Sequence, residues 1–305
     1  MFERVVVTGA AGGIARYVIH DLRDLCQLTL VDIEPGGSSH SIAQVDIRDI
    51  EALRRAFREQ EAVVHLAAVG EMATADATLN VNARGTWNVL EIARDCGLRK
   101  AVIMSSEAGL GMEYLDVDPP PLYVPIDEQH PFRPSDVYGL SKQLCESIGQ
   151  NFARRGDLSI VCLRPTEVTF PTVIADITSR LNSEISLGAR AVTRTWDDRS
   201  ALAISRAYVR PDDMARMIRL ALEVETEPYE VFWASAADTY APQPTLELLR
   251  DLQGSLPEVR RPRLYECIPN AAVFDISAAR ERLGWEPTGN WKQYLDEIKN
   301  ADSLE

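Results

Sequence analysis

The first half of the chain alternates short apolar runs with longer amphipathic stretches, and this rhythm restricts the fold more than any other feature. The apolar runs are almost unbroken, which is typical of strands buried on both faces of a parallel sheet. The amphipathic stretches are typical of helices that cover such a sheet. Strands are expected at Arg4–Thr8, Gln27–Asp32, Ile42–Asp46, Ala62–Leu66, Ala101–Ser105 and Ser159–Leu163. The pattern therefore predicts an α/β fold with a doubly wound parallel sheet.

The stretches between these strands carry helix signals. Four helices are expected: one that follows the first strand and ends near Leu25, and three others over Asp49–Phe57, Asp76–Cys96 and Asp136–Arg155. Gly97 follows the third of them, where a helix commonly ends in a glycine. Asp136, or Ser135 before it, has the side chain that an N-cap requires.

The rhythm changes after Arg164-Pro165, where clean strands become rare. We expect residues 1–165 to form the sheet domain and residues 166–305 a smaller C-terminal lobe. A strand and a helix near residues 207–235 are expected to return to the sheet. The other elements expected in this half are helices near Val173–Leu187, Asp212–Leu222, Thr245–Leu252 and Ser277–Leu283, and a strand at Glu230–Trp233. A proline-rich loop is expected over Asp116–Pro134.

The acidic charge of the chain disfavours several classes of partner. Lys and Arg total 32 against 46 Asp and Glu, a formal net charge of −14, so we expect neither nucleic acid nor an anionic membrane surface as a partner. The N-terminus lacks a basic-then-apolar signal region, and no apolar run approaches the ~18 residues of a spanning helix. The five cysteines form no CxxC pair, which argues against disulfides and structural zinc. We therefore expect a cytoplasmic protein without a metal site.

The strongest local motif is the glycine-rich turn Thr8–Ala15, which follows a strand and opens a helix. Glycines allow a tight turn and let backbone N–H groups approach a pyrophosphate, while the helix N-terminus adds a partial positive charge. This context is that of a dinucleotide-binding Rossmann sheet. The residues expected at the cofactor are Gly9, Ala11, Gly12, Gly13 and Ile14.

Asp32 ends the second strand, twenty residues after Gly12. A carboxylate at this place can accept hydrogen bonds from both ribose hydroxyls of an adenosine. The next residues, Ile33 and Glu34, offer no cation for a 2′-phosphate, which Asp32 would also repel. The sequence therefore favours NAD over NADP.

Tyr138 and Lys142 lie four residues apart on a predicted helix, so their side chains share one face. A free phenol titrates near pH ~10, so a tyrosine acts as a base near neutrality only where a cation stabilises its phenolate. An ammonium ~4 Å away supplies about 4 kcal/mol at an effective dielectric of ~20. Ser106 closes the fifth strand, where open α/β sheets bind ligands, and its hydroxyl can polarise a substrate oxygen.

These signals, in this order, resemble the extended branch of the short-chain dehydrogenase/reductase superfamily, also called the NAD-dependent epimerase/dehydratase family. Ser106, Tyr138 and Lys142 match its catalytic triad, and Leu283–Pro287 resembles its C-terminal LGWxP segment. The resemblance implies an NAD-binding domain at 1–165 and a substrate-binding lobe at 166–305. Further cofactor contacts that it implies are Asp46 and Ile47, Leu66, Ala67 and Ala68, Asn82, Pro165 and Val168, beside Asp32, Ile33, Tyr138 and Lys142.

The resemblance implies hydride exchange between NAD and a secondary alcohol or ketone. Tyr138 is then the acid or base, Ser106 holds the substrate oxygen, and Lys142 assists Tyr138 and binds the nicotinamide ribose. His65 is expected to be structural. Departures from the family narrow the substrate: Glu107-Ala108 stands where dehydratases have Asp-Glu, and Glu167 stands where nucleotide-sugar epimerases usually have Asn. A small sugar, sugar acid or similar polyol is therefore expected, as in uronate dehydrogenases.

Residues expected at the substrate are Ser106, Glu107, Thr166, Glu167 and Arg194, although a surface ion pair is the simpler interpretation of Arg194. Three functions stay open: a dehydrogenase that releases NADH, an epimerase that retains its NAD, and a non-catalytic NAD-binding regulatory protein. The helices over Asp76–Cys96 and Asp136–Arg155 resemble those that form the family's dimer, so a homodimer is expected.

Overall fold

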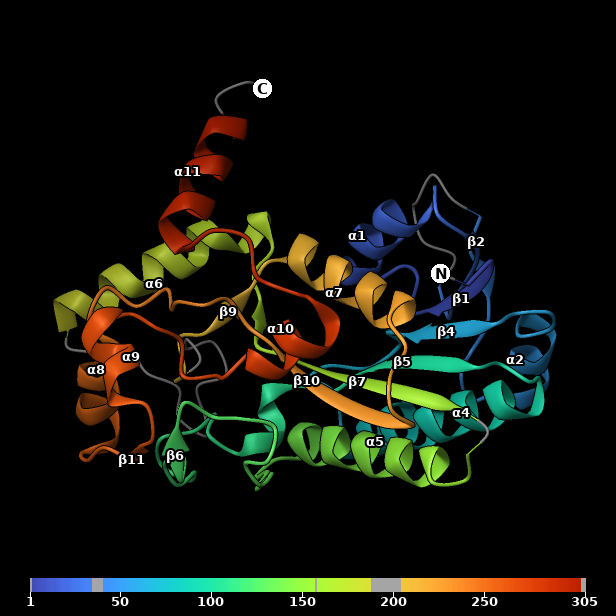
Figure 1. Cartoon of the computed structure of the whole chain (residues 1–305), viewed down its shortest axis with the longest axis horizontal. Helices are drawn as coiled ribbons and strands as arrows, with labels where there is room; N and C mark the ends of the chain where they lie inside the picture. The colour runs from blue at the N-terminus through green and yellow to red at the C-terminus, as the bar shows by residue number, and fades with distance from the viewer. Residues whose placement is uncertain (1, 35–40, 157, 188–203, 303–305) are drawn as a thin grey trace.

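A computed structural model (Figure 1) describes residues 2–34, 41–156, 158–187 and 204–302. Its centre is a parallel sheet of seven strands in the order β10-β7-β5-β4-β1-β2-β3. The strands are β1 (Arg4–Thr8), β2 (Gln27–Asp32), β3 (Ala43–Gln44), β4 (Ala62–His65), β5 (Lys100–Met104), β7 (Ser159–Pro165) and β10 (Tyr229–Ala234). This order confirms the doubly wound sheet. The winding reverses between β1 and β4, and ligands bind at the carboxyl ends of strands beside such a point.

Helices cover both faces of the sheet (Figure 1). On one face lie α1 (Gly13–Leu22), α7 (Pro211–Glu223) and α10 (Ser277–Leu283); on the other lie α2 (Ile50–Ala56), α4 (Gly85–Asp95) and α5 (Val137–Ala153). Side chains of β1 alternate between the two layers, since Val5 and Val7 pack toward α1 while Val6 packs toward α2 and α4. Burial on both faces explains why the strands read as unbroken apolar runs.

The helix expected over Asp76–Cys96 is wound differently in its first half. Helix α3 (Ala75–Thr78) continues into a π-helical turn, η1 (Leu79–Arg84), before α4 begins. Asn82 lies in this wider turn and holds the backbone of Val69 through two hydrogen bonds, from Val69 N–H to Oδ1 (2.9 Å) and from Nδ2 to the Val69 oxygen (3.0 Å). Single π-helical turns of this kind occur often at functional sites.

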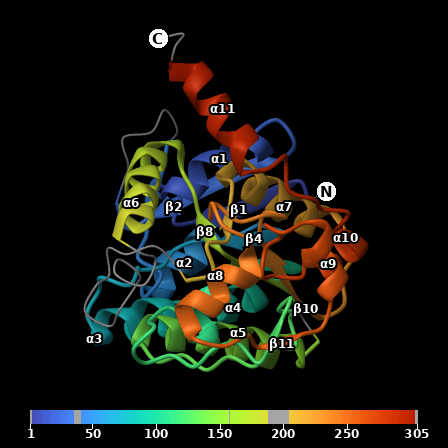
Figure 2. The same ribbon diagram turned by 90° about the vertical axis from the view of Figure 1, so that its left-hand side faces the viewer.

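Part of the C-terminal half gathers beyond the carboxyl ends of the strands (Figure 2), whereas α7, α10 and β10 belong to the layers of the sheet. Helices α6 (Ile174–Leu187), α7, α8 (Thr245–Gln253) and α10 lie where the sequence predicts helices. The sequence did not predict α9 (Pro262–Cys267), α11 (Trp291–Asp302), or two small parallel pairs, β8 (Glu167–Val168) with β9 (Tyr208–Val209) and β6 (Tyr123–Val124) with β11 (Glu258–Val259).

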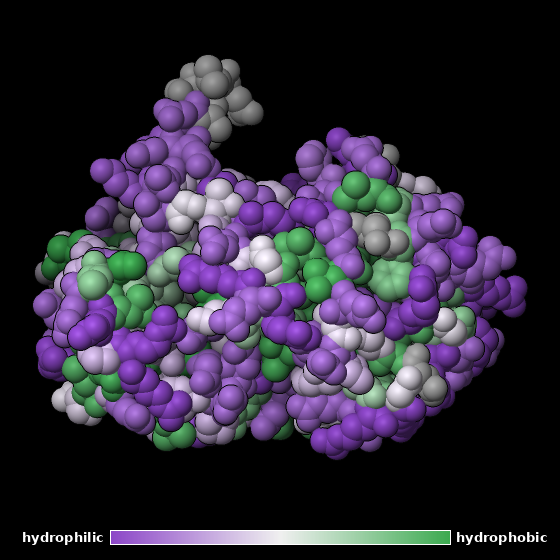
Figure 3. Space-filling model, viewed as in Figure 1, coloured by the Kyte–Doolittle hydropathy of each residue, from purple (hydrophilic) through white to green (hydrophobic). Residues whose placement is uncertain are grey.

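Helix α11 projects from the body of the protein, and its surface in Figure 3 is hydrophilic. Its Trp291 and Tyr294 join a small core with Tyr208, whose ring centre lies 5.0 Å from that of Trp291. Among the described residues, none of the helices combines the length and apolarity needed to cross a bilayer.

Candidate active site

The glycine-rich turn is built for close backbone approach. Gly9 has φ +72°, and a Cβ there would lie 2.5 Å from the Ala67 nitrogen, so a larger residue would collide with the backbone after β4. A Cβ on Gly13 would lie 2.9 Å from the Phe170 ring. Gly12 is the N-cap of α1 and supplies no capping side chain. The first N–H groups of α1 and its dipole are therefore directed at this turn, as an anion site requires.

Two cavities, of about 470 and about 200 Å³, meet at this turn and share Gly9, Gly12, Leu66 and Ala68. The larger is also lined by Gly13, Ile14, Ser106, Glu107, Tyr138, Lys142, Pro165, Thr166, Glu167 and Val168. The smaller is also lined by Asp32, Ile33, Asp46, Ile47 and Ala67. The structure thus brings nearly all of the predicted cofactor and substrate residues together along one two-part cavity.

Two predicted residues are placed differently. Ala11 lines neither cavity; its N–H donates to Asp32 Oδ2 at 2.9 Å, so it fixes the carboxylate. Asn82 is buried and donates to Ser141 Oγ on α5 at 3.0 Å, which makes it a support for the site rather than part of the lining of these two cavities. Arg194 lies outside the described residues.

Asp32 and Asp46 line the smaller cavity from the ends of neighbouring strands. Asp32 Oδ1 also accepts the Glu34 N–H at 3.1 Å, so both of its oxygens are oriented by the backbone. Arg48, which the sequence analysis missed, lines the same cavity and binds the Asp46 carboxylate with a closest contact of 2.6 Å. This hydrogen bond holds the pKa of Asp46 below its usual value. The signal available in the sequence was the Asp-x-Arg spacing.

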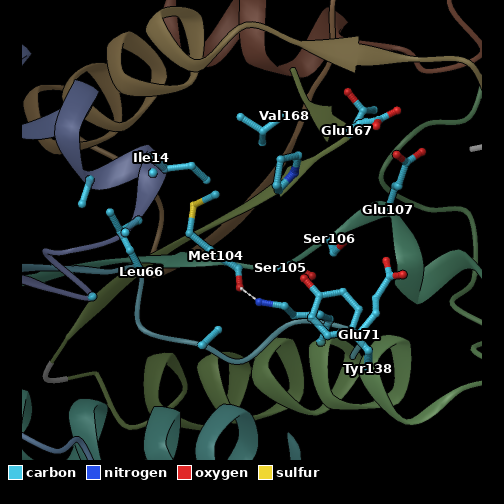
Figure 4. Close-up of a pocket in the computed structure, with 18 of the residues that line it drawn as sticks. Ile14, Leu66, Glu71, Met104, Ser105, Ser106, Glu107, Tyr138, Glu167 and Val168 are labelled. Atoms are coloured by element: carbon cyan, nitrogen blue, oxygen red, sulfur yellow. Dashed lines mark hydrogen bonds between the residues drawn. The ribbon is translucent and has the colours of Figure 1, made fainter. Parts of the chain in front are cut away.

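The proposed triad meets in the larger cavity (Figure 4). Asp136 is the N-cap of α5: its carboxylate accepts the Gly139 N–H at 2.7 Å, which confirms the predicted cap. Lys142 Nζ donates to the Met104 backbone oxygen at 3.1 Å and lies 5.4 Å from the centre of the Tyr138 ring. Ser106 follows β5 and its Oγ accepts the Ala108 N–H at 3.2 Å.

Carboxylates gather at the Tyr138 end of this cavity, whereas Ile14 and Leu66 line the opposite end (Figure 4). Figure 4 labels Glu71, Glu107 and Glu167 there, and Glu113 also lines the cavity. Ser205 Oγ donates to Glu107 at 2.9 Å, and Tyr240 donates its hydroxyl to Glu167 at 2.8 Å. Burial, with Glu167 adding to it, raises the pKa of Tyr240. The sequence analysis missed Glu71 and Glu113 because they lie in loops without a motif.

His65 lies beneath the cavity and is fully enclosed. Its ring nitrogens hydrogen-bond to Thr8 Oγ1 (2.7 Å) and Thr86 Oγ1 (3.1 Å). Burial, reinforced by the Lys142 ammonium, lowers the pKa of His65 to about 3. The ring is therefore neutral at physiological pH and acts as a spacer between β1, β4 and α4, which confirms the structural interpretation.

The site fits a dinucleotide. The glycines of the turn add no side chains, and the first N–H groups of α1 face it. The smaller cavity holds an oriented carboxylate, and the larger cavity continues from the turn to Tyr138. Among the described residues, no group of three His, Cys, Asp or Glu side chains is arranged to hold a metal ion.

Comparison with known proteins agrees with this geometry. The profile described as "NAD dependent epimerase/dehydratase family" matches residues 5–233. A uronate dehydrogenase of Pseudomonas syringae pv. tomato is 26% identical over 257 residues, which are 82% of this chain and 85% of the relative. An L-arabinose 1-dehydrogenase (NAD(P)(+)) of Haloferax volcanii is 30% identical over 63% of this chain and 76% of the relative.

Among solved structures, a short-chain dehydrogenase/reductase superfamily protein from Agrobacterium tumefaciens with bound NAD superimposes with a TM-score of 0.74. Its sequence is 24% identical, and the match covers 99% of this chain and 98% of the other. This likeness supports the fold alone. The family match, over residues 5–233, covers most of the chain. The chain therefore belongs to the NAD-dependent epimerase/dehydratase family and is an NAD-dependent enzyme of the extended short-chain dehydrogenase/reductase type.

Proposed function

We propose that this enzyme oxidises a secondary alcohol of a small sugar or similar polyol with NAD. The observation that carries the proposal is that Ser106, Tyr138 and Lys142 line one cavity that continues without interruption to the glycine-rich turn. A dinucleotide bound at the turn would extend into this cavity, beside the three side chains. NAD, when bound, supplies the acceptor for the substrate's hydride.

Each of the three side chains has a role that fits its position. Tyr138 takes the proton of the substrate hydroxyl, because its phenolate is stabilised by the Lys142 ammonium across the α5 surface. Lys142 also offers donors to a nicotinamide ribose. Ser106 donates a hydrogen bond to the reacting oxygen and polarises it. Side chains of this protein thus accept the proton, bind the substrate oxygen and stabilise the developing charge.

The cofactor residues divide along the two cavities in the proposal. The N–H groups of Gly13 and Ile14, the first of α1, hold the pyrophosphate, while the Gly12 N–H closes the turn onto the Gly9 oxygen at 3.0 Å. Asp32 accepts the adenosine ribose hydroxyls. Asp46 and Ile47 contact the adenine, while Pro165 and Val168 lie where the nicotinamide would be placed. Because Asp32 would repel a 2′-phosphate, NAD is the preferred cofactor.

The glutamates of the larger cavity favour a substrate that donates hydrogen bonds. An ionised carboxylate accepts hydrogen bonds and repels other anions, so a wall rich in glutamates suits hydroxyl groups better than a substrate phosphate or carboxylate. Thr166 adds a hydroxyl to the same wall. We therefore favour a neutral, hydroxyl-rich sugar over a nucleotide sugar, and we place a sugar acid second.

An epimerase that retains its NAD is the second candidate function. The Phe170 ring packs against Gly13 and Tyr17, so it covers the turn that would hold the pyrophosphate. Such a cover would slow the release of the cofactor. Slow release suits an epimerase, which retains its NAD, whereas a dehydrogenase must release NADH after each turnover.

Absorbance at 340 nm distinguishes the candidates. The purified protein is mixed with NAD and, in turn, neutral aldoses such as L-arabinose, uronic acids and a uridine diphosphate sugar. Stoichiometric NADH with a neutral sugar supports the proposal, and conversion without net NADH supports the epimerase. If the protein binds NAD but neither forms NADH nor converts any of these compounds, it is the non-catalytic regulatory protein.

We further propose a homodimer formed through α4 and α5. Leu140 and Leu144 lie one turn apart on α5 and are 40% and 36% exposed. Leu79, in the turn before α4, is 38% exposed. Large apolar side chains on these neighbouring helices fit a surface that a second copy would cover.

A further inference from the structure

A buried ion pair lies directly behind the larger cavity. The Glu146 carboxylate accepts two bonds from the Arg164 guanidinium, from Nε to Oε1 and from Nη2 to Oε2, both at 2.8 Å. Ser105 Oγ donates to the same Oε1 at 2.6 Å. Both charged side chains are 7% exposed. The bidentate geometry fixes the two partners in direction as well as distance.

Ser105, Glu146 and Arg164 form one hydrogen-bonded network. They come from the three elements that carry the proposed reaction. Ser105 immediately precedes Ser106 after β5, and Arg164 immediately precedes Pro165 at the end of β7. Glu146 lies one helical turn beyond Lys142 on α5. The network therefore ties the serine, the Tyr138–Lys142 pair and the nicotinamide wall to one another from the side away from the substrate.

Arg164 is itself held rigidly. Its Nη1 donates to the Glu128 backbone oxygen at 3.0 Å, and its guanidinium lies 4.2 Å from the centre of the Phe132 ring and 5.0 Å from that of Trp233. Phe132 also packs against Gly109, in the turn that follows Ser106. All three nitrogens of the guanidinium are thus hydrogen-bonded, and the group also contacts two aromatic rings.

Stability alone does not account for such a pair. Burying two charges costs desolvation energy, and apolar residues of similar size are often equally or more stabilising at such places. What a bidentate pair adds is fixed geometry among the elements that it joins.

We propose that Glu146 and Arg164 are positioning residues that set the distance between the Ser106 hydroxyl and the Tyr138 phenol. The inference rests on the proposed roles of these two side chains. A misplacement of about 1 Å among reacting groups costs about 100-fold in rate.

The test compares the wild-type protein with the double variant Glu146→Leu/Arg164→Met, which removes both charges and leaves neither one buried alone. A second variant, Glu146→Gln, keeps the shape and the acceptor for Ser105 but sets an amide donor against Arg164. Asp213→Asn is the matched control: Asp213 is a buried carboxylate that binds Thr288 and Arg216 away from the cavity. Each protein is measured for kcat, KM, NAD affinity and melting temperature, and crystal structures give the Ser106 Oγ to Tyr138 Oη distance.

We expect kcat to fall 10- to 100-fold in either Glu146 variant while NAD affinity and KM change less than threefold. We also expect the Ser106–Tyr138 distance to change, whereas Asp213→Asn lowers the melting temperature and leaves kcat unchanged. A folded Glu146 variant with wild-type kcat and an unchanged distance overturns the inference. If wild-type protein turns over none of the sugars, the proposed function fails and the crystal distances alone decide: a shifted distance supports the positioning role, and an unshifted one overturns it.

Discussion

Lys142 Nζ donates a hydrogen bond across 3.1 Å to the backbone oxygen of Met104, the last residue of β5. Ser106 follows two residues later, so this bond fastens α5 to the strand end that carries the serine. The same ammonium lies 5.4 Å from the centre of the Tyr138 ring. An amino group held in this way stays beside the Tyr138 ring, which is the arrangement that a tyrosine base requires.

The first prediction concerns Tyr138. Tyr138→Phe removes the acid–base group and keeps the ring, so we expect kcat to fall by about 100- to 10,000-fold. NAD affinity, measured by protein fluorescence titration, should change only a few-fold because the glycine-rich turn is intact. Steady-state NADH formation gives kcat.

Tyr265→Phe is the matched control for this substitution. Tyr265 is buried, its hydroxyl donates to the Ala272 backbone oxygen (3.3 Å), and it lines neither of the two cavities. We expect wild-type kcat from it. Turnover by Tyr138→Phe at the wild-type rate would remove Tyr138 from the mechanism.

The second prediction concerns Asp32 and cofactor choice. Asp32→Ser removes the carboxylate that the Ala11 and Glu34 N–H groups orient. We expect NAD affinity to fall about 10- to 150-fold, since a charge-assisted hydrogen bond contributes about 1.5–3 kcal/mol. The preference for NAD over NADP should narrow, because the repulsion of a 2′-phosphate is lost. Isothermal titration with both cofactors measures the two effects.

Asp24→Ser provides the control, since Asp24 is an exposed carboxylate paired only at the surface with Arg23. It should bind both cofactors as the wild-type protein does. An Asp32→Ser protein with an unchanged NAD-to-NADP ratio would place the ribose elsewhere.

The sequence was sufficient for the parts of the site that local chemistry determines. Gly9 adopts a positive φ, and such a position selects glycine within a few residues of a strand end. Tyr138 and Lys142 are brought together by helical spacing alone, and Asp32 by its place at the end of β2. Each of these relationships spans one element or one turn, so a pattern in the sequence records it.

Contacts between distant segments left no such record. Glu146 and Arg164 meet because α5 packs behind β7, and Glu71 and Glu113 reach the cavity from separate loops. The π-helical turn at Asn82 depends on the backbone of Val69, which no helical periodicity predicts. Helix α11 is different, because it carries a local signal that the sequence analysis missed: the Asn290 N–H donates to Gln293 Oε1 and the Gln293 N–H donates to Asn290 Oδ1, both at 3.0 Å, which is a capping box. Tertiary packing decides the other features.

The third prediction concerns the dimer. Leu144→Glu places a charge among the exposed apolar side chains of α5, and desolvating it in an interface would be unfavourable. We expect the wild-type protein to sediment as a dimer at micromolar concentration and Leu144→Glu to sediment as a monomer. Analytical ultracentrifugation measures both.

The control is Leu25→Glu, which charges a leucine that is 50% exposed after α1, away from α5. It should remain dimeric. A monomeric wild-type protein, or a dimer that both substitutions disrupt equally, would exclude the α5 surface as the interface.

The last prediction concerns acid stability and His65. Burial holds the pKa of folded His65 at about 3, against 6.5 for a solvent-exposed histidine, as in the unfolded chain. Below pH 6.5 the unfolded chain therefore binds a proton that the folded protein does not, so the stability contributed by neutral His65 is complete above pH 6.5 and is lost as the pH falls toward 3. At about 1.4 kcal/mol per pH unit, the loss between pH 7.5 and 5 is about 2 kcal/mol.

His65→Asn removes this titration and should flatten the fall in the free energy of unfolding over that range by about 2 kcal/mol, although the variant starts from a lower stability because Thr8 and Thr86 lose their partner. His20→Asn, at an exposed position on α1, should keep the wild-type slope. Urea unfolding at pH 7.5, 6.5, 5.5 and 5 gives the slopes. The other titrating groups are the same in all three proteins, so a difference in the slope of unfolding free energy against pH comes from His65. An identical slope in wild type and His65→Asn would mean that His65 takes up a proton in the folded state. The Thr8–His65–Thr86 bridge would then open in acid.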